Sequence, residues 1–350
     1  MKKLFLSLCF GLACCFTGSA QIVFEGKVYD KSTREPLPGA YVYMNGTSIY
    51  TTTDSSGVFK LSIEKFINAS LVVAHMAYDQ IVVANPFENL PESFYLEEKR
   101  ISMEEVRIVA DRYTKETKLA VFKEQFLGMT RAGKMCRIEN EGDIVIKYDP
   151  EEKVLTAYSI NPLIVHNSYL GYRIEFNLVD FKITYADALS IENHNVVQSY
   201  FLGNSSFIDL EPYKVATKRR RDAIYKQSSV YFMKQLVNRD LESANFRILD
   251  GMKRIEIDDC FIITDQNGAK SLYIRPGIND GLHSSEIGRT FRGAISVMGR
   301  GSASRIVFLT DRILVDQYGN IDKIGEIIFY GEMGDQRLGD TLPLDYNYGG

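Results

Sequence analysis

Three segments near the start of the chain decide its fold: Phe24-Glu-Gly-Lys-Val-Tyr-Asp30, Glu35-Pro-Leu-Pro-Gly-Ala-Tyr-Val42 and Thr53-Asp-Ser-Ser-Gly-Val-Phe59. Apolar and polar residues alternate within these segments, and Gly, Pro, Asp and Ser separate one short run from the next. This alternation is typical of β-strands joined by tight turns. Residues 22–97 therefore predict a small antiparallel β-domain, and seven short strands with frequent turns favour a β-sandwich.

Local chemistry supports the individual elements of this domain. Asp54-Ser-Ser-Gly57 predicts a tight turn, because Asp can accept hydrogen bonds from nearby backbone N–H groups and Gly tolerates a positive φ. Residues 71–74 and 80–84 are nearly continuous apolar runs. Such runs indicate strands in the middle of a sandwich, where both faces are covered.

The residues of these segments resemble the carboxypeptidase regulatory-like domain, a transthyretin-like sandwich. Eight positions carry the resemblance: Gly26, Asp30, Pro36, Pro38, Gly39, Asp54, Gly57 and Phe59. Bacterial members usually have Gly-Tyr after the fifth strand, where this chain has Ala77-Tyr78. The resemblance implies a domain that accompanies a catalytic or transport domain and assists folding or interaction. It does not imply peptidase activity.

Composition places the chain among globular proteins of two or three domains. It has 350 residues, of which 45% are hydrophobic and 25% charged, and its formal net charge is −4. This hydrophobic content is enough for a substantial core. The mild acidity argues against a nucleic-acid partner, which would favour a basic surface.

The N-terminus has the pattern of an export signal. Two lysines precede the apolar residues 4–16, and Gly18-Ser-Ala20 forms a small-residue cleavage site. Residues 1–20 are therefore predicted to be a signal peptide, too short to span a membrane as a helix. The alternative is a lipoprotein signal with a lipid anchor at Cys15, but the cleavage pattern favours soluble export. We expect a protein of the periplasm or one associated with the outer membrane.

Two cysteines, Cys136 and Cys260, lie beyond the predicted signal peptide. An even pair in an oxidising compartment can form a disulfide. The alternative is two buried thiols that pack as small hydrophobic side chains. The separation in sequence does not decide between them, because a disulfide requires close Cα atoms.

After a charged predicted linker at residues 98–113, the hydrophobic period becomes helical. Residues 113–130 are predicted to form an amphipathic helix, since apolar side chains recur every three or four positions at Leu119, Phe122, Phe126 and Met129. Thr114 or Thr117 is suited to cap the start of this helix, and Gly128 or Gly133 to mark its end.

Strand patterns return from Cys136 onward, interrupted by a second predicted helix over residues 213–241. Its apolar stripe consists of Ala223, Val230, Met233, Val237 and Leu241. Residues 114–335 therefore predict a larger α+β domain with two prominent helices, followed by a C-terminal tail at 336–350.

This second region also resembles a set of exported proteins of Gram-negative bacteria that are named only for their first domain. The similar segments are Phe122-Lys-Glu-Gln-Phe-Leu-Gly128, Cys136-Arg-Ile-Glu-Asn140, Leu170-Gly-Tyr-Arg-Ile-Glu-Phe176 and Lys218-Arg-Arg-Arg-Asp-Ala-Ile-Tyr225. The resemblance implies the same two-part organisation and brings no catalytic residues with it.

One motif suggests a metal site. His283-Ser-Ser-Glu286 has the spacing of a zinc-carboxypeptidase ligand pair, but zinc needs a third protein ligand. The other histidines all lie upstream, whereas those enzymes place their third ligand downstream and their catalytic domain before the regulatory one. His283 and Glu286 are thus an incomplete ligand set, and we expect no metal, cofactor or catalytic site.

Other reactive patterns have simpler interpretations. Lys218-Arg-Arg-Arg221 could meet a phosphate, a lipid headgroup or an acidic partner, but a solvated or salt-bridged helix face is favoured, with Glu211, Asp222 and Asp240 nearby. Neither a Gly-x-Ser-x-Gly motif nor a Walker loop occurs. Adjacent acidic residues such as Asp258 and Asp259 are common in β-hairpins.

Together these features predict a non-enzymatic cell-envelope protein that acts in protein interaction or structural support. Its contacts would be sheet edges and the basic helix. Two alternatives stay open: an exported hydrolase of the metallopeptidase kind, and an accessory module of a TonB-dependent uptake system. We expect a partner among other envelope proteins.

Overall fold

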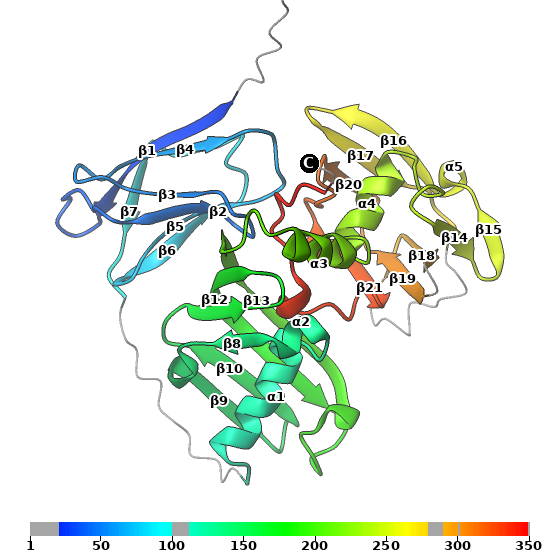
Figure 1. The fold of residues 1–350 in the computed structure, drawn as a ribbon, viewed down its shortest axis with the longest axis horizontal. Helices are drawn as coiled ribbons and strands as arrows, with labels where there is room; N and C mark the ends of the chain where they lie inside the picture. Colours follow the sequence, from blue (N-terminus) through cyan, green and yellow to red (C-terminus); the bar gives the residue numbers. More distant parts are fainter. Residues whose placement is uncertain (1–20, 100–111, 279–289, 300–301, 349–350) are drawn as a thin grey trace, which may run out of the picture.

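The computed structural model describes residues 21–99, 112–278, 290–299 and 302–348. These residues form three lobes around a central region in which the C-terminal segment lies (Figure 1). We call them the sandwich, the second lobe and the third lobe. Each has its own cluster of buried apolar side chains.

The sandwich contains the seven predicted strands in two sheets. One sheet has the order β4 (Val58–Ile63), β1 (Ile22–Asp30), β7 (Ser93–Leu96), and the other the order β3 (Tyr50–Thr52), β2 (Tyr41–Met44), β5 (Leu71–His75), β6 (Tyr78–Val83). Phe24, Phe59 and Phe94 from the first sheet are buried with Val42 and Val73 from the second. The predicted sandwich is confirmed.

Two details of the prediction are wrong. The domain is not wholly antiparallel, because β7 pairs with β1 in parallel after the chain crosses back from the second sheet. The apolar run at residues 80–84 belongs to the edge strand β6, where Val82 is half-exposed. β5 does lie between two neighbours, and its first three residues are fully buried.

The second lobe packs one helix against a six-stranded sheet. The helix α1 (Lys115–Leu127) begins at Thr114, whose side chain accepts a hydrogen bond from the N–H of Thr117, and ends at Gly128. The path of the sheet is β8 (Cys136–Ile138), β11 (Leu163–Asn167), β12 (Tyr172–Tyr185), β10 (Val154–Ser159) and β9 (Ile144–Asp149). The long strand β13 (Val196–Asp209) pairs with the full length of β12. A short helix, α2 (Arg131–Lys134), follows α1.

The third lobe combines two antiparallel sheets with helices. One sheet has the order β15 (Lys253–Ile255), β14 (Phe246–Asp250), β18 (Gly293–Gly299), β19 (Ser302–Phe308), β21 (Ile327–Gly331). The other has the order β16 (Phe261–Gln266), β17 (Ala269–Ile274), β20 (Arg312–Asp316). A short α5 (Ile257–Cys260) precedes β16. The predicted α+β region therefore holds two separate cores.

The helix predicted over residues 213–241 is two helices, α3 (Val215–Tyr225) and α4 (Ser229–Val237). Ser228 separates them. Its hydroxyl donates to the carbonyl of Tyr225 at 2.7 Å and accepts from the N–H of Tyr231 at 3.1 Å. Serine favours such capping because its side chain competes for backbone hydrogen bonds. Of the predicted stripe, Met233, Val237 and Leu241 are buried, but Ala223 is exposed.

The predicted C-terminal tail is an integral part of the core. Leu338 is buried in the second lobe, Leu344 packs against the sandwich, and Tyr346 and Tyr348 pack into the third lobe. We call residues 338–348 the C-terminal strap. Its position at the centre of the molecule is visible in Figure 1.

Hydrogen bonds fasten the strap to the sandwich and the second lobe. The N–H of Leu344 donates to the carbonyl of Gly46 at 2.8 Å. The carboxylate of Asp345 accepts from the N–H and hydroxyl of Ser48 at 2.9 and 2.6 Å. The side-chain amide of Asn167 donates to the carbonyl of Gly339 at 2.8 Å. The strap thus holds the three lobes in a defined arrangement.

The sandwich also contacts the third lobe directly. Asp316, at the end of β20, accepts hydrogen bonds from the N–H of Asn68 at 2.8 Å and from the side-chain amide of Asn320 at 2.9 Å. Burial raises the pKa of the Asp316 carboxyl.

Across the part of the chain that the structure describes, no helix is long and apolar enough to cross a membrane.

Candidate functional site

Asp30, one of the eight positions that carry the resemblance, is the centre of a hydrogen-bond network in the sandwich. One carboxylate oxygen accepts from the N–H of Ser32 at 2.7 Å and from the N–H of Thr33 at 2.8 Å. The other accepts from the hydroxyl of Tyr78 at 2.7 Å. Hydrogen bonds from Ser32, Thr33 and Tyr78 hold the pKa of Asp30 well below its usual range. Asp30 therefore shapes the turn after β1 and ties it to β6 in the other sheet.

Two glycines of the pattern are required by close approach. A Cβ on Gly26 would lie 2.8 Å from the ring of Phe59. Gly57 has a φ of 72°, and a Cβ there would lie 2.5 Å from the carbonyl oxygen of Val28. Because Gly26 and Gly57 have no side chain, β1 and β4 can pack closely over the buried ring of Phe59.

The remaining positions of the pattern form turns. Asp54 accepts from the N–H groups of Ser56 and Val58 at 2.8 and 3.0 Å, as its turn motif predicts. Pro36 makes an isolated bridge with Tyr29, and Gly39, after Pro38, adopts a positive φ of 73°. The eight positions thus act in folding the sandwich, and the structure groups them around turns and close strand contacts.

The two cysteines lie in different cores. Cys136 packs against the core of the second lobe, where its Sγ donates to the carbonyl of Ala132 at 3.3 Å, and Cys260 is buried in the third lobe. Both are free thiols. Burial raises the pKa of each thiol to about 12, so neither is an activated nucleophile.

The incomplete metal pair His283 and Glu286 lies outside the described residues, as do the predicted signal peptide with Cys15 and most of the linker at 98–113. Within the described ranges no group of three or more His, Cys, Asp or Glu side chains is placed to hold a metal ion. His166 instead pairs with Glu139 at 2.8 Å.

Most side chains of the basic cluster form salt bridges, and the most deeply buried of them is Arg221. Only 5% of Arg221 is exposed. Its guanidinium donates to both carboxylate oxygens of Asp209 at 2.7 Å, stacks 3.9 Å from the ring centroid of Tyr172, and donates to the carbonyl of Leu170 at 2.7 Å. Arg221 thereby fixes α3 to the end of β13. Asp209 was not among the acids predicted to pair with the cluster, because it lies 12 residues away and outside the helix.

The flanking members of the cluster are closer to the surface. Lys218 pairs with Asp222 at 3.3 Å, and Arg220 lies 3.8 Å from Glu211. Asp240, the third acid expected nearby, instead accepts from Ser243. Arg219 is exposed on the same helix.

The neighbouring carboxylates Asp258 and Asp259 have separate tasks. Asp258 accepts from both terminal nitrogens of Arg239 at 3.0 and 2.8 Å, and this hydrogen bonding lowers the pKa of the carboxyl. Asp259 accepts from the N–H of Glu256 at 3.2 Å and caps α5. They do not form an acid–base pair.

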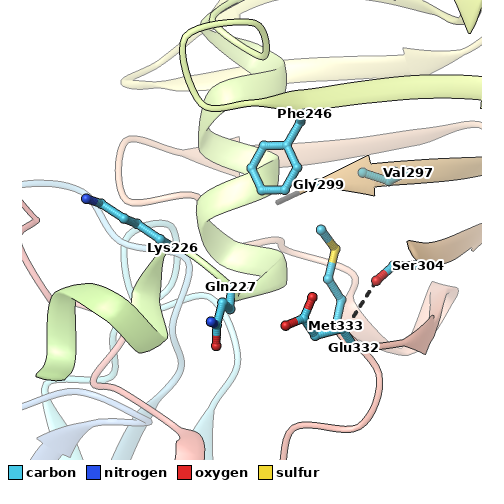
Figure 2. A pocket seen from close by; sticks show the side chains of 8 residues that line it. All are labelled: Lys226, Gln227, Phe246, Val297, Gly299, Ser304, Glu332 and Met333. Carbon is cyan, nitrogen blue, oxygen red and sulfur yellow. Dashed lines mark hydrogen bonds between the residues drawn. The ribbon is translucent and has the colours of Figure 1, made fainter. Parts of the chain in front are cut away.

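A small cavity lies where the α3–α4 junction meets the ends of β14 and β18 (Figure 2). Its volume is about 50 Å³. Phe246 and Val297 line it above, and Gln227 and Met333 below, where the N–H of Met333 donates to the hydroxyl of Ser304 at 3.1 Å. Ligand pockets usually measure several hundred Å³, so this cavity suits one or two water molecules.

A wider hollow of about 550 Å³ opens on the other side of Phe246. Its charged rim includes Arg254, which pairs with Glu242, and the exposed Arg247. The charged side chains at the rim of this hollow form an ion pair and do not converge on one point. The hollow is therefore not a candidate reactive site.

The outer edge of β13 is the clearest open surface for a partner. Near its C-terminal end this edge already pairs with a turn of the sandwich: the N–H of Gly46 donates to the carbonyl of Ser205 at 2.6 Å, and the N–H of Phe207 to that of Thr47 at 2.9 Å. Nearer its start, no described strand pairs with this edge. Val197 and Leu202 there are 68% and 58% exposed.

Comparison with known proteins identifies one part of the chain. No curated protein matches it. A family model, the CarboxypepD_reg-like domain, matches residues 24–108, which include the strands of the sandwich except the first two residues of β1. The match covers about a quarter of the chain and leaves the second and third lobes outside it. The hydrogen bonds around Asp30, the close approach at Gly26 and Gly57 and this match together show that residues 24–108 contain a carboxypeptidase regulatory-like domain.

Proposed function

We propose that this is an exported, non-enzymatic protein of the cell envelope that binds another envelope protein and supports envelope structure. The export pattern of residues 1–20 supports a location in the periplasm or at the outer membrane. The domain at residues 24–108 supports an interaction role, which the resemblance implies.

One observation carries the proposal: the open half of the β13 edge. An exposed strand edge presents unpaired backbone N–H and C=O groups to which an extended segment of another protein can add. The exposed Val197 and Leu202 would add apolar contacts. Residues 46 and 47 already bond to the far half of the same edge, so backbone pairing on this side of β13 occurs within the chain itself.

The strand is also held rigidly, which favours binding. Its other side pairs with β12 from Val196 to Asp209, with register shifts that skip Val179 and Val197, and Asp209 at its end is bound by Arg221. At its start, Ser199 donates to Gln125 of α1 at 2.6 Å. A pre-ordered edge loses little conformational entropy when a partner strand adds to it.

Site-specific photo-crosslinking in cells tests the proposal. A photoreactive residue at position 197 or 202 is expected to crosslink one reproducible envelope protein, identified by mass spectrometry. The control position is 252, since Met252 is fully exposed on the third lobe. Val197→Lys and Leu202→Lys should abolish co-purification, because edge lysines oppose strand addition. Equal crosslinking from all three positions, or none from 197 and 202, would count against the proposal.

A further inference from the structure

Three exposed apolar side chains lie together at the turn between β13 and α3. Leu210, Tyr213 and Val215 are 48%, 95% and 65% exposed. They occupy six consecutive residues, so they form a local apolar projection. Clustered exposed apolar groups mark interaction sites more often than scattered ones do.

Cations surround this projection. Lys214 and Arg219 are exposed on the same turn and on the first half of α3, with Arg219 one helical turn from Val215. Arg131 of α2 is exposed and lies near α3, because the ring centroid of Tyr169 is 5.3 Å from the guanidinium of Arg131 and 5.0 Å from that of Arg220. A cation from an element distant in sequence is thus brought close to α3.

The start of α3 adds positive potential. Its N-cap residue, Lys214, makes no side-chain capping hydrogen bond, so the first-turn N–H groups of α3 lack a side-chain cap. Two acids lie at this turn: Glu211 accepts from Lys214 at 2.8 Å, and Asp209 is bound by Arg221. Arg131 and Arg219 are exposed cations that form no ion pair with an acid among the described residues. The patch is thus locally basic although the whole chain carries a formal charge of −4.

We propose that this patch, Leu210, Tyr213 and Val215 with Arg131, Lys214 and Arg219, docks the protein on an anionic membrane surface. Tyrosine and aliphatic side chains would enter the boundary between headgroups and acyl chains, and the cations would contact anionic headgroups. The inference rests on the proposed envelope location and names a second contact that is independent of the β13 edge.

A membrane fits these side chains better than a protein or a free phosphate does. The apolar groups project outward from a turn, whereas a phosphate site needs cations that converge on one point. Lysine and arginine side chains can extend their charges along a lipid surface while their stems stay apolar. Exposed apolar side chains with basic side chains around them are typical of proteins that bind to a membrane surface.

Vesicle co-sedimentation tests the inference with the purified chain from residue 21 onward, because residues 4–16 are themselves apolar and would bind lipid. We expect binding to phosphatidylcholine vesicles that contain about a third phosphatidylglycerol, and little binding to phosphatidylcholine alone. Raising the salt concentration to about 0.5 M should weaken binding through screening.

Two variants separate the two contributions. Arg131→Gln with Arg219→Gln should lower the partition coefficient about fivefold per charge. The second variant, Tyr213→Ser with Val215→Ser, should also lower the partition coefficient, although its net charge is unchanged. The matched controls are Arg247→Gln with Lys253→Gln, and Tyr330→Ser with Ile324→Ser, all exposed on the third lobe. Circular dichroism verifies that each variant is folded.

Loss of binding in both patch variants, with both control pairs unchanged, would support the inference. No binding of the unaltered protein to anionic vesicles would overturn it, as would equal losses in patch and control variants. Crosslinking of an acidic protein through position 213, without vesicle binding, would assign the patch to a protein partner and also overturn it. None of these results alters crosslinking at Val197, so failure here is distinguishable from failure of the proposed function.

Discussion

At the scale of single residues, the side chain of Arg221 combines burial with charge. It lies in the middle of α3, pairs with Asp209 through two parallel hydrogen bonds and covers the ring of Tyr172. A buried charge of this kind is stabilised by its partners and becomes costly when a partner is removed. Its neighbour Arg219 has the same chemistry but is exposed.

We predict that Arg221→Ala lowers the free energy of unfolding by about 3 kcal/mol, because it leaves the Asp209 carboxylate without its bidentate partner. Arg221→Lys should recover part of this loss, since lysine keeps the charge but not the paired geometry. Urea unfolding measures both variants. Arg219→Ala is the matched control, with an expected change below about 0.5 kcal/mol. Equal losses at positions 219 and 221 would contradict the prediction.

The hydrogen bonds to Asp30 lead to a prediction about acid stability. Because the pKa of Asp30 is lower in the folded state than its ordinary value of 3.8, the unfolded chain binds more protons at acidic pH. The stabilisation by Asp30 is therefore complete above pH 3.8 and is lost as the pH falls toward the folded-state pKa.

Tyr78→Phe removes one hydrogen bond to Asp30 and should bring its pKa closer to the ordinary value. We expect the midpoint of acid unfolding to move to higher pH, as measured by circular dichroism during acid titration. Tyr95→Phe, which removes an exposed hydroxyl from the same domain, is the control. An unchanged acid midpoint in Tyr78→Phe would show that this hydrogen bond does not affect the titration of Asp30.

At the scale of elements, the C-terminal strap is the segment whose role differs most from its sequence pattern. It forms no long helix or strand, yet its side chains enter all three cores. A Cβ on Gly46 would lie 3.0 Å from Leu344, so the strap and the sandwich are closely packed there. The hydroxyl of Tyr346 also donates to Asp222 on α3 at 2.5 Å.

We predict that Leu344→Ala combined with Tyr346→Ala divides thermal unfolding into separate transitions. Each lobe has its own core, and the strap supplies contacts that make their unfolding cooperative. Leu344→Ala alone should cost about 2 kcal/mol, the lower end for a leucine that is only partly buried. Differential scanning calorimetry measures both effects. Met252→Ala is the control, and a single transition that only shifts to lower temperature would refute the coupling role.

At the scale of the whole molecule, the arrangement places the two proposed contact surfaces at opposite ends of β13. The open edge lies near the start of the strand, whereas Arg221 of α3 binds Asp209 at its end, beside the basic turn. The β13 edge would hold a protein strand, and the turn before α3 would contact a membrane. The sandwich contributes by bonding its 46–47 turn to the far half of β13.

Much of the fold was predictable because it depends on short-range chemistry. The alternation in β1 and β4, the turn at Asp54 and the cap at Thr114 each involve residues within a few positions of one another. The break between α3 and α4 was not predicted, since the apolar stripe continues through it and Ser228 alone marks it. The parallel pairing of β7 with β1 depends on a crossover, which strand periodicity does not report.

The sequence by itself determined the sandwich, its turn-forming residues and the helix at residues 115–127, because period and turn chemistry are local properties of the chain. Tertiary structure decided which distant residues meet: Asp30 with Tyr78, Asp209 with Arg221, and the strap with all three lobes. It also decided which edge of β13 has no paired strand near its start and brought Arg131 and Arg220 to the ring of Tyr169. These features arise from long-range packing, where the partner of a side chain is set by the path of the whole chain.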